Sequence, residues 1–544
     1  MQVASDHRAR TGAPAGWVRW RLALVLGLVV VLAGYLRLRG LVPMNVGLLY
    51  PQDYDEAVWG TTAQLMLQGY LPYRDFFATL PPLGIYLFAV ALRVVYVPWG
   101  SGIGFMAMRY ASVLSGLLSL GAIYRVGRKL AGRWTGIAAA AILALDGMAV
   151  AMDRRVMLEP SLNLFSILAV GTYLHVAEAT DRRVCRRGIA LAAGALSAMA
   201  ALAKTPGMVV ILALLTVSLL RRRWTEAILL VIGFGVSWLV ICAPFLLRCP
   251  GDLLRQAYFF QLLRPPDGML RRTTRLLDIW RNDRAWLTVR MGALGTAWTL
   301  AWVGLRRRTH LWWAILAWLG YAVALLLVNG SYWSQYYVQL VPPLSLLAGS
   351  LIGAPEVHPR GSRRWATALG LVAASLVLGV GLVGGGAIAQ TRATLKEIGQ
   401  KSTAYTEIAE YLAQNTEPDT SILTFEPNYT FLSSRRLVGS APGRWLVDSY
   451  GEMLYLNLGI GNMSVQELTA AVATGKRSSL QETFWRAPAQ RQIEMAFERA
   501  EYVIVDGRAR YQVQPPLLSR LEARSVEVLA AGVASLRAVE RPEP

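Results

Sequence analysis

The sequence is poor in charged side chains and in cysteine. Only 16% of its 544 residues are Asp, Glu, Lys or Arg, whereas soluble domains carry about 25%. The three cysteines, Cys185, Cys242 and Cys249, are too few for a disulfide scaffold or a zinc module with four thiolates. Hydrophobic residues make up 54% of the chain. An aqueous fold of this size cannot bury so many apolar side chains, so the composition excludes an ordinary soluble enzyme.

Several familiar site motifs are also absent. The four histidines are His7, His175, His310 and His358, which we expect in the cytoplasmic tail, at the inner end of a span and in inner loops. No zinc ligand set can be built from them on the outer side. The sequence has no GxxxxGK[ST] phosphate loop and no GxSxG nucleophile elbow, which argues against nucleotide hydrolysis and serine esterase chemistry.

The basic residues do not form one face. The formal net charge is +21, but Lys and Arg fall in short clusters between apolar runs. This distribution is typical of multispanning membrane proteins and argues against a nucleic-acid partner. A spanning helix needs about 20 mostly apolar residues. The sequence offers eleven candidate spans, near 20–38, 105–124, 134–151, 160–178, 188–204, 206–220, 225–247, 288–305, 311–328, 335–353 and 365–388.

Short basic loops stay cytoplasmic, so all the basic clusters should lie on one side of the membrane. They do so if residues 82–97 lie at the outer interface, because a crossing there would move every later cluster outside. This short stretch carries Arg93 and is bounded by Pro82 and Pro98, as is typical of interfacial helices. We therefore predict a polytopic α-helical protein of the cell membrane with a cytoplasmic N-terminus.

The composition changes after residue 390. Residues 391–544 lose the long apolar runs, and the helical periodicity of TEIAEYLAQNT is followed by the short runs SILTFEP, EYVIVDG and SVEVLAAG. This pattern predicts a small soluble α/β domain, which the span count places outside the cytoplasm. We expect a transmembrane catalytic domain over 1–390 and the soluble domain over 391–544.

The strongest local signal is the sequence DYDE, from Asp53 to Glu56. Asp55 and Glu56 are neighbours, so on a helix they point about 100° apart and cannot both serve one atom. One of them can act as a base while the other orients it or holds a metal. Acids at a helix start also cap free amide groups and favour the helix dipole, and this alternative stays open.

Two further signals lie between apolar spans. In DRRVMLEP, Asp153 to Pro160, charged groups at the membrane edge either do work or form an internal cluster of Asp153 and Glu159 with Arg154 and Arg155. Lys204 precedes a Pro-Gly break, where a lysine can extend to the interface or the free amides can bind a phosphate.

Two outer segments carry less specific signals. The segment NGSYWSQYYVQ, residues 329–339, is rich in interfacial aromatics, of which Tyr332 and Trp333 fit an ordinary belt. The loop 248–287 is rich in arginine, so it either binds anionic membrane lipids or a phosphorylated lipid donor, or forms solvated ion pairs.

The order of these features resembles a known group. One span is followed by D-E, by G-x-x-P-Y-R-D (Gly69 to Asp75), by Pro81–Pro82, by a hairpin acid, by K-x-x-G and by a late YY-x-x-x-x-PP. Over residues 20–355 this order resembles the GT-C membrane glycosyltransferases. Within them it resembles the family 39 group, with the protein mannosyltransferases and the lipid A aminoarabinose transferases.

The resemblance implies roles for individual residues. Asp55 matches the first-loop acid taken as catalytic, and Glu56 is the acid beside it. Glu159 falls where relatives place an acid in the second outer loop. Lys204 matches a lysine near the donor phosphate, to which we add Arg155 as a further candidate.

Other positions match less closely. Gln335 to Tyr337 fall where relatives often show a basic residue or His before a Tyr, and Gln335 departs from that pattern. Asp53 is an extra acid beside the expected base. Arg74 and Asp75 in the G-x-x-P-Y-R-D motif complete the candidate site residues.

The resemblance implies transfer of a sugar from a polyprenyl phosphate to a hydroxyl of a glycan, lipid or protein acceptor, outside the cytoplasm. Asp55 would accept the acceptor's proton, and one displacement would invert the anomeric centre. Lys204, Arg155, loop arginines or a divalent metal ion would stabilise the leaving phosphate. The alternative is a transporter or flippase of lipid-linked substrates, which predicts acids at mid-bilayer and broken helices in matched halves. The enzyme reading requires Asp55 and Glu159 to converge on one pocket.

Overall fold

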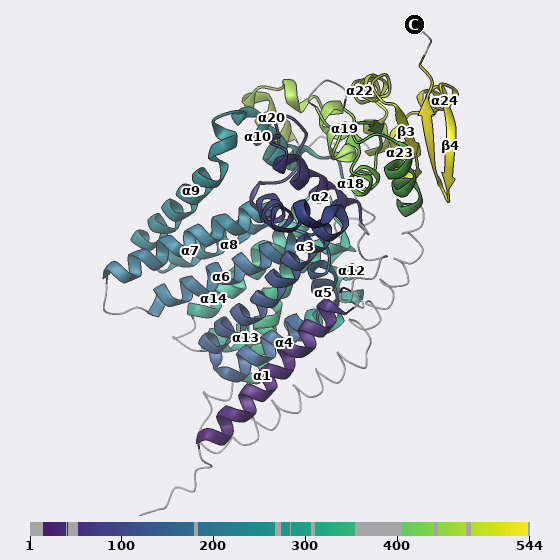
Figure 1. Ribbon diagram of the computed structural model, residues 1–544. Coiled ribbons are helices and arrows are strands. Elements are labelled where there is room, and N and C mark those ends of the chain that lie inside the picture. The colour runs from purple at the N-terminus through teal and green to yellow at the C-terminus, as the bar shows by residue number, and fades with distance from the viewer. Residues whose placement is uncertain are drawn as a thin grey trace, which may run out of the picture.

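The computed structural model of the chain describes residues 15–39, 41, 53–178, 183–266, 274–282, 284–305, 310–353, 405–439, 444–474 and 480–541. Figure 1 shows a bundle of long helices with a smaller domain, formed by the C-terminal part of the chain, at one end. The helix α2 (Tyr54–Leu67) and the short α10 (Pro250–Leu254) lie at that same end. The bundle therefore meets the smaller domain through segments that connect its long helices.

The bundle consists of long and medium helices. They are α1 (Ala15–Leu38), α3 (Leu83–Ala131), α4 (Arg133–Leu145), α5 (Gly147–Asp153), α6 (Glu159–Glu178), α7 (Arg183–Ala203), α8 (Met208–Leu220), α9 (Trp224–Leu246), α13 (Trp286–Leu305), α14 (His310–Val328) and α15 (Val341–Gly353). Shorter helices connect them, namely η2 (Thr205–Gly207), η3 (Arg255–Phe259), α11 (Phe260–Leu263), α12 (Arg275–Arg281) and η5 (Ser334–Leu340).

Not all of the expected spans are long and apolar enough to cross a membrane. Within the described ranges, four helices are long and apolar enough to do so, namely Ile103–Ala131, Arg186–Ala203, Trp224–Leu246 and Leu311–Val328. The helices α4 and α5 make a fifth if the pair, bent by 67°, counts as one span. The expected span 365–388 lies outside the described residues. The count of eleven therefore stays a prediction.

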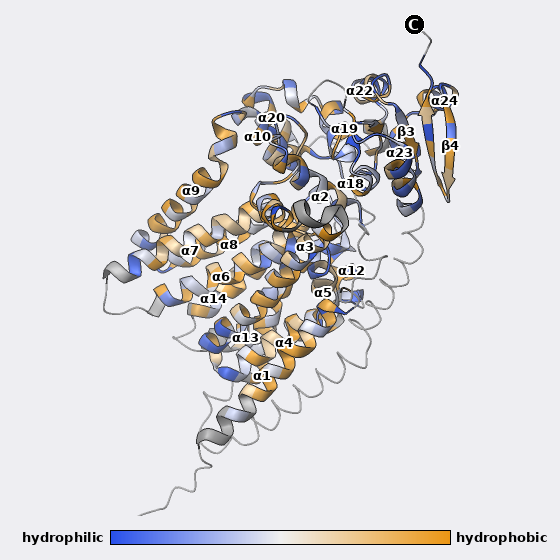
Figure 2. Ribbon diagram, in the orientation of Figure 1, coloured by the Kyte–Doolittle hydropathy of each residue, from blue (hydrophilic) through white to orange (hydrophobic). Residues whose placement is uncertain are grey.

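The outward faces of the bundle helices are apolar. Figure 2 shows mostly hydrophobic helices in the bundle and a more mixed C-terminal domain. On α9, Ile228, Val236 and Val240 are 58%, 56% and 67% exposed, and only 22% of the apolar window of this helix is buried. Water would make such a surface costly, whereas lipid does not.

The segment expected at the outer interface is the first part of a longer helix. Residues 83–131 form the single helix α3 of 49 residues, which at 1.5 Å per residue is roughly 74 Å long. This length is more than twice the roughly 30 Å of a bilayer's hydrocarbon. Only its part from Ile103 to Ala131 meets the length and hydropathy of a span. A position of residues 82–97 at the interface stays a prediction.

The C-terminal part of the chain forms a five-stranded sheet in the order β2-β1-β3-β5-β4. Its strands are β1 (Ser421–Leu423), β2 (Arg436–Leu437), β3 (Tyr502–Val505), β4 (Ser525–Ala531) and β5 (Ala534–Val539). The strand β1 is parallel to both β2 and β3, while β5 is antiparallel to β3 and β4. The three β-branched runs of the sequence each contain one of these strands.

Helices surround this sheet. They are α18 (Asn428–Ser433), α19 (Ser449–Asn457), η7 (Ile460–Asn462), α20 (Val465–Thr474), α21 (Leu480–Phe484), α22 (Ala487–Phe497), α23 (Gly507–Gln512) and α24 (Pro515–Ala523). The TEIAEYLAQNT segment is also helical, over 405–415. The expected domain boundary near residue 390 lies outside the described residues.

Aromatic contacts join the bundle to the C-terminal domain. The ring of Phe77, in the loop before α3, packs at 5.4 Å from Phe260 and at 5.0 Å from Tyr455 between ring centroids. Phe76 forms a β-bridge with Trp445, whose backbone N–H donates to the Asp75 carbonyl over 3.2 Å. The interface between the two parts is thus packed like a core, and it fixes the residues around it.

Candidate active site

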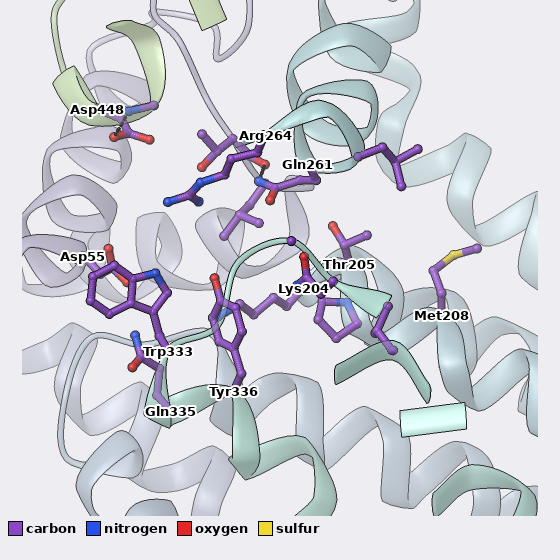
Figure 3. Close-up of a pocket in the computed structure, with 18 of the residues that line it drawn as sticks. Asp55, Lys204, Thr205, Met208, Gln261, Arg264, Trp333, Gln335, Tyr336 and Asp448 are labelled. Atoms are coloured by element: carbon purple, nitrogen blue, oxygen red, sulfur yellow. Dashed lines mark hydrogen bonds between the residues drawn. The ribbon is translucent and has the colours of Figure 1, made fainter. Parts of the chain in front are cut away.

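A cavity of about 660 Å³ lies where the bundle meets the C-terminal domain. Its charged lining consists of Asp53, Asp55, Lys204, Arg264, Asp448 and Arg508. Its apolar lining includes Val209 and Leu212 of α8 and Leu325 and Val328 of α14. In Figure 3, Met208 at the start of α8 lies on the opposite side of Lys204 from Asp55. The cavity therefore has a charged end and an apolar end.

Asp55 lies in the first turn of α2, and Asp53 is the residue that caps this helix. The Asp53 side chain accepts a hydrogen bond from the backbone N–H of Asp55 over 3.4 Å. Burial and the neighbouring negative charge of Asp53 raise the pKa of Asp55 to about 7, and the positive charge of Lys204 opposes them. A carboxyl group with a pKa near 7 is well matched to accept a proton at neutral pH.

Glu56 faces away from the cavity. Its carboxylate is fully buried and accepts two hydrogen bonds of 3.0 Å from the guanidinium of Arg109 on α3. It also accepts one of 2.8 Å from the backbone N–H of Val156. Glu56 therefore ties α2 to α3 and to the turn before α6, and it does not line the cavity with its neighbour. The helical offset between Asp55 and Glu56 predicts this divergence.

The charged residues of the turn from Asp153 to Glu159 pair outside the turn. Asp153 accepts from Arg37 of α1 over 2.7 Å, and Arg154 donates to the carbonyl of Leu36 over 2.6 Å. Arg155 pairs with Asp53 over 3.3 Å, which holds the turn beside the start of α2. In the described contacts, these residues pair with groups outside the turn. They do not form the internal cluster of Asp153 and Glu159 with Arg154 and Arg155 that the sequence left open.

Glu159 and Lys204 form an ion pair of 2.5 Å beside the cavity, in which Lys204 is part of the cavity lining and Glu159 is not. Lys204 precedes the short helix η2, and its Nζ atom lies 5.2 Å from the centre of the Tyr336 ring. Burial opposes the charged form of Lys204, but the charge and hydrogen bond of Glu159, together with Tyr336 and Asp55, outweigh it, so the pKa of Lys204 is raised. Lys204 is thus a fixed positive charge that lines the same cavity as Asp55.

The segment η5 places neighbouring residues on different sides. Gln335 and Tyr336 line the cavity, whereas Tyr337 is fully buried in the bundle. The Tyr337 hydroxyl donates to Asp146, at the bend between α4 and α5, over 2.9 Å. The resemblance led us to expect Tyr337 at the donor phosphate. In the structure Tyr336 lies at the cavity and Tyr337 anchors the segment behind it.

Arg74 and Asp75 lie outside the cavity lining. They form a two-point ion pair with both distances at 2.8 Å, and Asp75 also accepts from the Leu71 backbone N–H over 2.7 Å. The guanidinium lowers the pKa of the Asp75 carboxyl. This pair stabilises the loop that packs against Trp445.

Within the described residues, the arginine-rich loop 248–287 contributes Gln261, Leu262 and one arginine to the cavity. Arg264 lines it, with its guanidinium 5.3 Å from the centre of the Tyr450 ring. Arg275 instead donates to backbone carbonyls, including that of Leu326 over 2.6 Å. Arg271 and Arg272 lie outside the described residues.

Sequence reasoning missed the residues of the C-terminal domain. Asp448, Tyr450 and Arg508 line the cavity, and Tyr54 also lines it between the two expected acids. Asp448 has the local signal of a helix cap, since it accepts from the Gly451 backbone N–H over 2.9 Å. No local sequence signal predicts that Asp448 lies beside Tyr54, which is 394 positions earlier in the chain.

The sequence left open a divalent metal ion in the site, which would need several ligand side chains close together. Within the described ranges, no group of three or more His, Cys, Asp or Glu side chains is arranged to hold one. The described residues therefore do not fit a metal site.

The fold belongs to a defined class, the GT-C glycosyltransferases, as the resemblance predicted. The chain superposes on ArnT from Cupriavidus metallidurans in the apo state with a TM-score of 0.57 and 17% identity, covering 98% of this chain and 100% of that one. The ArnT structure bound to undecaprenyl phosphate gives 0.56 at 17% identity with the same coverage. The apo oligosaccharyltransferase of Archaeoglobus fulgidus gives 0.56 at 13% identity, covering 96% of this chain and 75% of that one.

The sequence match to a protein family covers a smaller part of the chain than the structural matches do. The family described as dolichyl-phosphate-mannose-protein mannosyltransferase matches residues 80–247, which is less than half of the chain. No curated protein matches the sequence. Together with the apolar helices, these similarities indicate a multi-pass membrane protein with the fold of the GT-C glycosyltransferases.

Proposed function

We propose that this protein transfers a sugar from a polyprenyl-phosphate donor to an acceptor hydroxyl on the extracytoplasmic side of the membrane. The observation that carries the proposal is the composition of one cavity: a carboxyl group with a pKa near 7, fixed cations beside it, and an apolar end between α8 and α14. A lipid-linked sugar phosphate has matching parts, namely an apolar tail, an anionic phosphate and a reacting carbon. ArnT has been crystallised with undecaprenyl phosphate, which agrees with such a donor.

In this proposal Asp55 is the general base. The acceptor oxygen attacks the anomeric carbon, the bond from that carbon to the phosphate oxygen breaks, and the acceptor proton passes to Asp55. A single displacement from the face opposite the leaving group inverts the anomeric centre. Asp53 and Arg155 hold the first turn of α2, and burial followed by the charge of Asp53 raises the pKa of Asp55 to about 7, so that it can accept the proton.

The leaving phosphate gains negative charge as the bond breaks. Lys204 and Arg264 line the cavity and carry the positive charges that stabilise it. Glu159 fixes Lys204 through the 2.5 Å ion pair, so the ammonium group does not have to reorient during the reaction. Tyr336 covers that ammonium group, and Gln335 adds a neutral polar group to the same wall.

The experiment is a transfer assay with purified protein and a panel of radiolabelled polyprenyl-phosphate sugars, with glycan, lipid and protein acceptors, with and without EDTA. We expect transfer from at least one donor, and we expect Asp55→Asn to abolish it while donor binding persists. Asp75→Asn is the matched control, because that acid lies outside the cavity and should leave transfer intact. Full activity of Asp55→Asn would overturn the assignment, and donor translocation without transfer would favour a flippase.

A further inference from the structure

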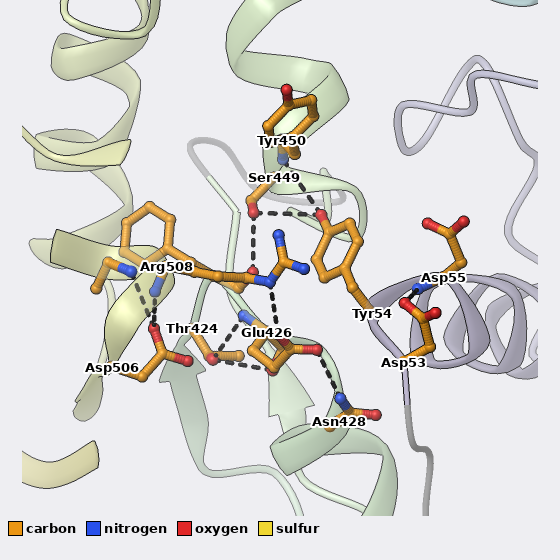
Figure 4. A network of polar contacts seen from close by, with 12 residues as sticks. Asp53, Tyr54, Asp55, Thr424, Glu426, Asn428, Ser449, Tyr450, Asp506 and Arg508 are labelled. Atoms are coloured by element: carbon orange, nitrogen blue, oxygen red, sulfur yellow. Dashed lines mark hydrogen bonds and ion pairs between the residues drawn. The ribbon is translucent and has the colours of Figure 1, made fainter. Parts of the chain in front are cut away.

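One residue of the C-terminal domain holds the segment that carries Asp55. The guanidinium of Arg508 stacks over the ring of Tyr54, with 3.7 Å from its central carbon to the ring centroid. Tyr54 lies directly before Asp55 in α2. Figure 4 shows Arg508 beside the Tyr54 ring, with Asp53 and Asp55 beyond it. This contact joins two parts of the chain that are far apart in sequence.

The position of Arg508 is fixed by its own domain. Its Nε atom donates to the buried carboxylate of Glu426 over 2.6 Å, and the other oxygen of that carboxylate accepts from Asn428 over 2.6 Å. Glu426 follows β1 and Arg508 follows β3, and these two strands are parallel neighbours. Both residues therefore lie at the carboxyl edge of the sheet, which is where parallel sheets commonly present functional side chains.

Tyr54 is held at its other end as well. Its hydroxyl donates to Asp448 over 3.0 Å and accepts from the backbone N–H of Tyr450 over 3.2 Å. The ring and the hydroxyl of Tyr54 are thus both fixed by the C-terminal domain. The contact uses a partly buried ion pair and several polar groups around one tyrosine, and such directional contacts fix orientation as well as separation.

We propose that Arg508 is a positioning residue for the transfer reaction: by clamping Tyr54 it holds the first turn of α2 so that the Asp55 carboxylate stays directed into the cavity. The C-terminal domain is then part of the catalytic unit and not only an acceptor-binding module. This inference rests on the proposed function.

The positive charge of Arg508 also acts on Asp55, since the two groups interact electrostatically. A cation near a carboxyl group favours its charged form. Loss of the charge therefore raises the pKa of the base, and the acid limb of the rate profile moves to higher pH. A purely structural contact would not produce that shift.

The test compares Arg508→Gln, Arg508→Lys and Arg524→Gln in the full-length protein. Arg524 is a matched control, because it also pairs with a glutamate and lies over an aromatic ring, 5.4 Å from Phe497, but does not line the cavity. The measurements are kcat and the donor KM as functions of pH, together with the thermal unfolding midpoint of each variant.

We expect Arg508→Gln to lower kcat by about 100-fold, as displacement of a reacting group does, with the donor KM unchanged and the acid limb at higher pH. Arg508→Lys keeps the positive charge but not the planar stacking on Tyr54. It should therefore return the acid limb of the pH profile to its wild-type position and recover part of the rate. Arg524→Gln should match the wild type.

Two results would overturn the inference. One is an Arg508→Gln protein that behaves like Arg524→Gln. The other is a loss of rate with an unmoved pH limb and no rescue by Arg508→Lys, which would make the residue merely structural. A wild-type protein that transfers no sugar from any donor would instead overturn the proposed function, and this inference with it.

Discussion

The ammonium group of Lys204 lies 2.5 Å from one oxygen of the Glu159 carboxylate, and the second oxygen of Glu159 is buried without a partner among the residues that the structure describes. The pair joins the start of α6 to the junction of α7 and η2. Of this pair, the expected phosphate-binding lysine lines the cavity that Asp55 lines, whereas the expected second-loop acid lies behind it and outside the cavity lining. The negative charge of Glu159 also contributes to the raised pKa of Asp55.

Removal of the Lys204 charge should impair transfer. We expect Lys204→Met to lower kcat by about 10² to 10³-fold, the usual effect of losing one fixed group that stabilises developing charge. It also leaves Glu159 as an uncompensated buried charge, which costs about 3–5 kcal/mol of stability. The measurements are the transfer rate and the free energy of unfolding in detergent.

The double variant Lys204→Met/Glu159→Gln separates these two effects. It removes the unpaired charge, so it should recover stability but not rate. Lys204→Arg keeps a cation at the cavity wall and serves as the conservative control. A Lys204→Met protein with the wild-type rate would show that the lysine does not stabilise the leaving group.

The transfer rate should depend on the protonation of Asp55. A general base must be deprotonated, and burial followed by the charge of Asp53 raises its pKa to about 7. Below that pH the carboxyl group is protonated and inactive, so the rate should rise as the pH passes upward through about 7. The check is the pH profile of kcat/KM under donor-limiting conditions.

Asp53→Asn provides the internal test of this assignment. It removes the second-largest cause of the raised pKa, so the acid limb should move to lower pH. The amide can still cap α2 through its oxygen, so the helix start is preserved. Two results would exclude Asp55 as the titrating base. One is a pH profile of kcat/KM that is flat around pH 7, and the other is an acid limb that does not move in Asp53→Asn.

The start of α2 could be predicted largely from the sequence. The DYDE motif left open whether its acids cap a helix or do chemistry, and in the structure its two aspartates have different positions. Asp53 caps the helix, and Asp55 lies in the first turn and faces the cavity. The offset of neighbouring helical residues already required Glu56 to point elsewhere. Its partner Arg109, 53 positions later, could not be predicted because no local pattern specifies a distant counter-ion.

Other features depended on tertiary structure. The apolar run 134–151 was expected as one span, but it bends by 67° at Asp146, whose carboxylate accepts from Thr288 over 2.7 Å. Composition alone does not reveal a break whose polar groups are satisfied by another helix. The motif YY-x-x-x-x-PP likewise gives no sign of which tyrosine faces the cavity, because a one-residue shift in η5 exchanges them.

The pair of Glu56 and Arg109 should matter for stability. Glu56→Gln leaves the buried guanidinium without its carboxylate, and we expect the free energy of unfolding to fall by about 3–5 kcal/mol. The double variant Glu56→Gln/Arg109→Met removes both charges and should be less destabilised. Thermal or denaturant unfolding in detergent measures both. Unchanged stability of Glu56→Gln would contradict a role for this pair in holding α2 against α3.

The two tyrosines of η5 should respond oppositely to substitution. Tyr337→Phe removes the hydrogen bond to Asp146, so we expect a loss of about 1.5–3 kcal/mol of stability with little change in the donor KM. Tyr336→Leu removes the ring that covers the Lys204 ammonium group, so it should raise the donor KM or lower kcat while stability changes little. Transfer kinetics and unfolding measured on the same preparations give the comparison. If Tyr337→Phe impaired donor binding and Tyr336→Leu did not, the donor phosphate would have to lie on the other side of η5, away from Lys204.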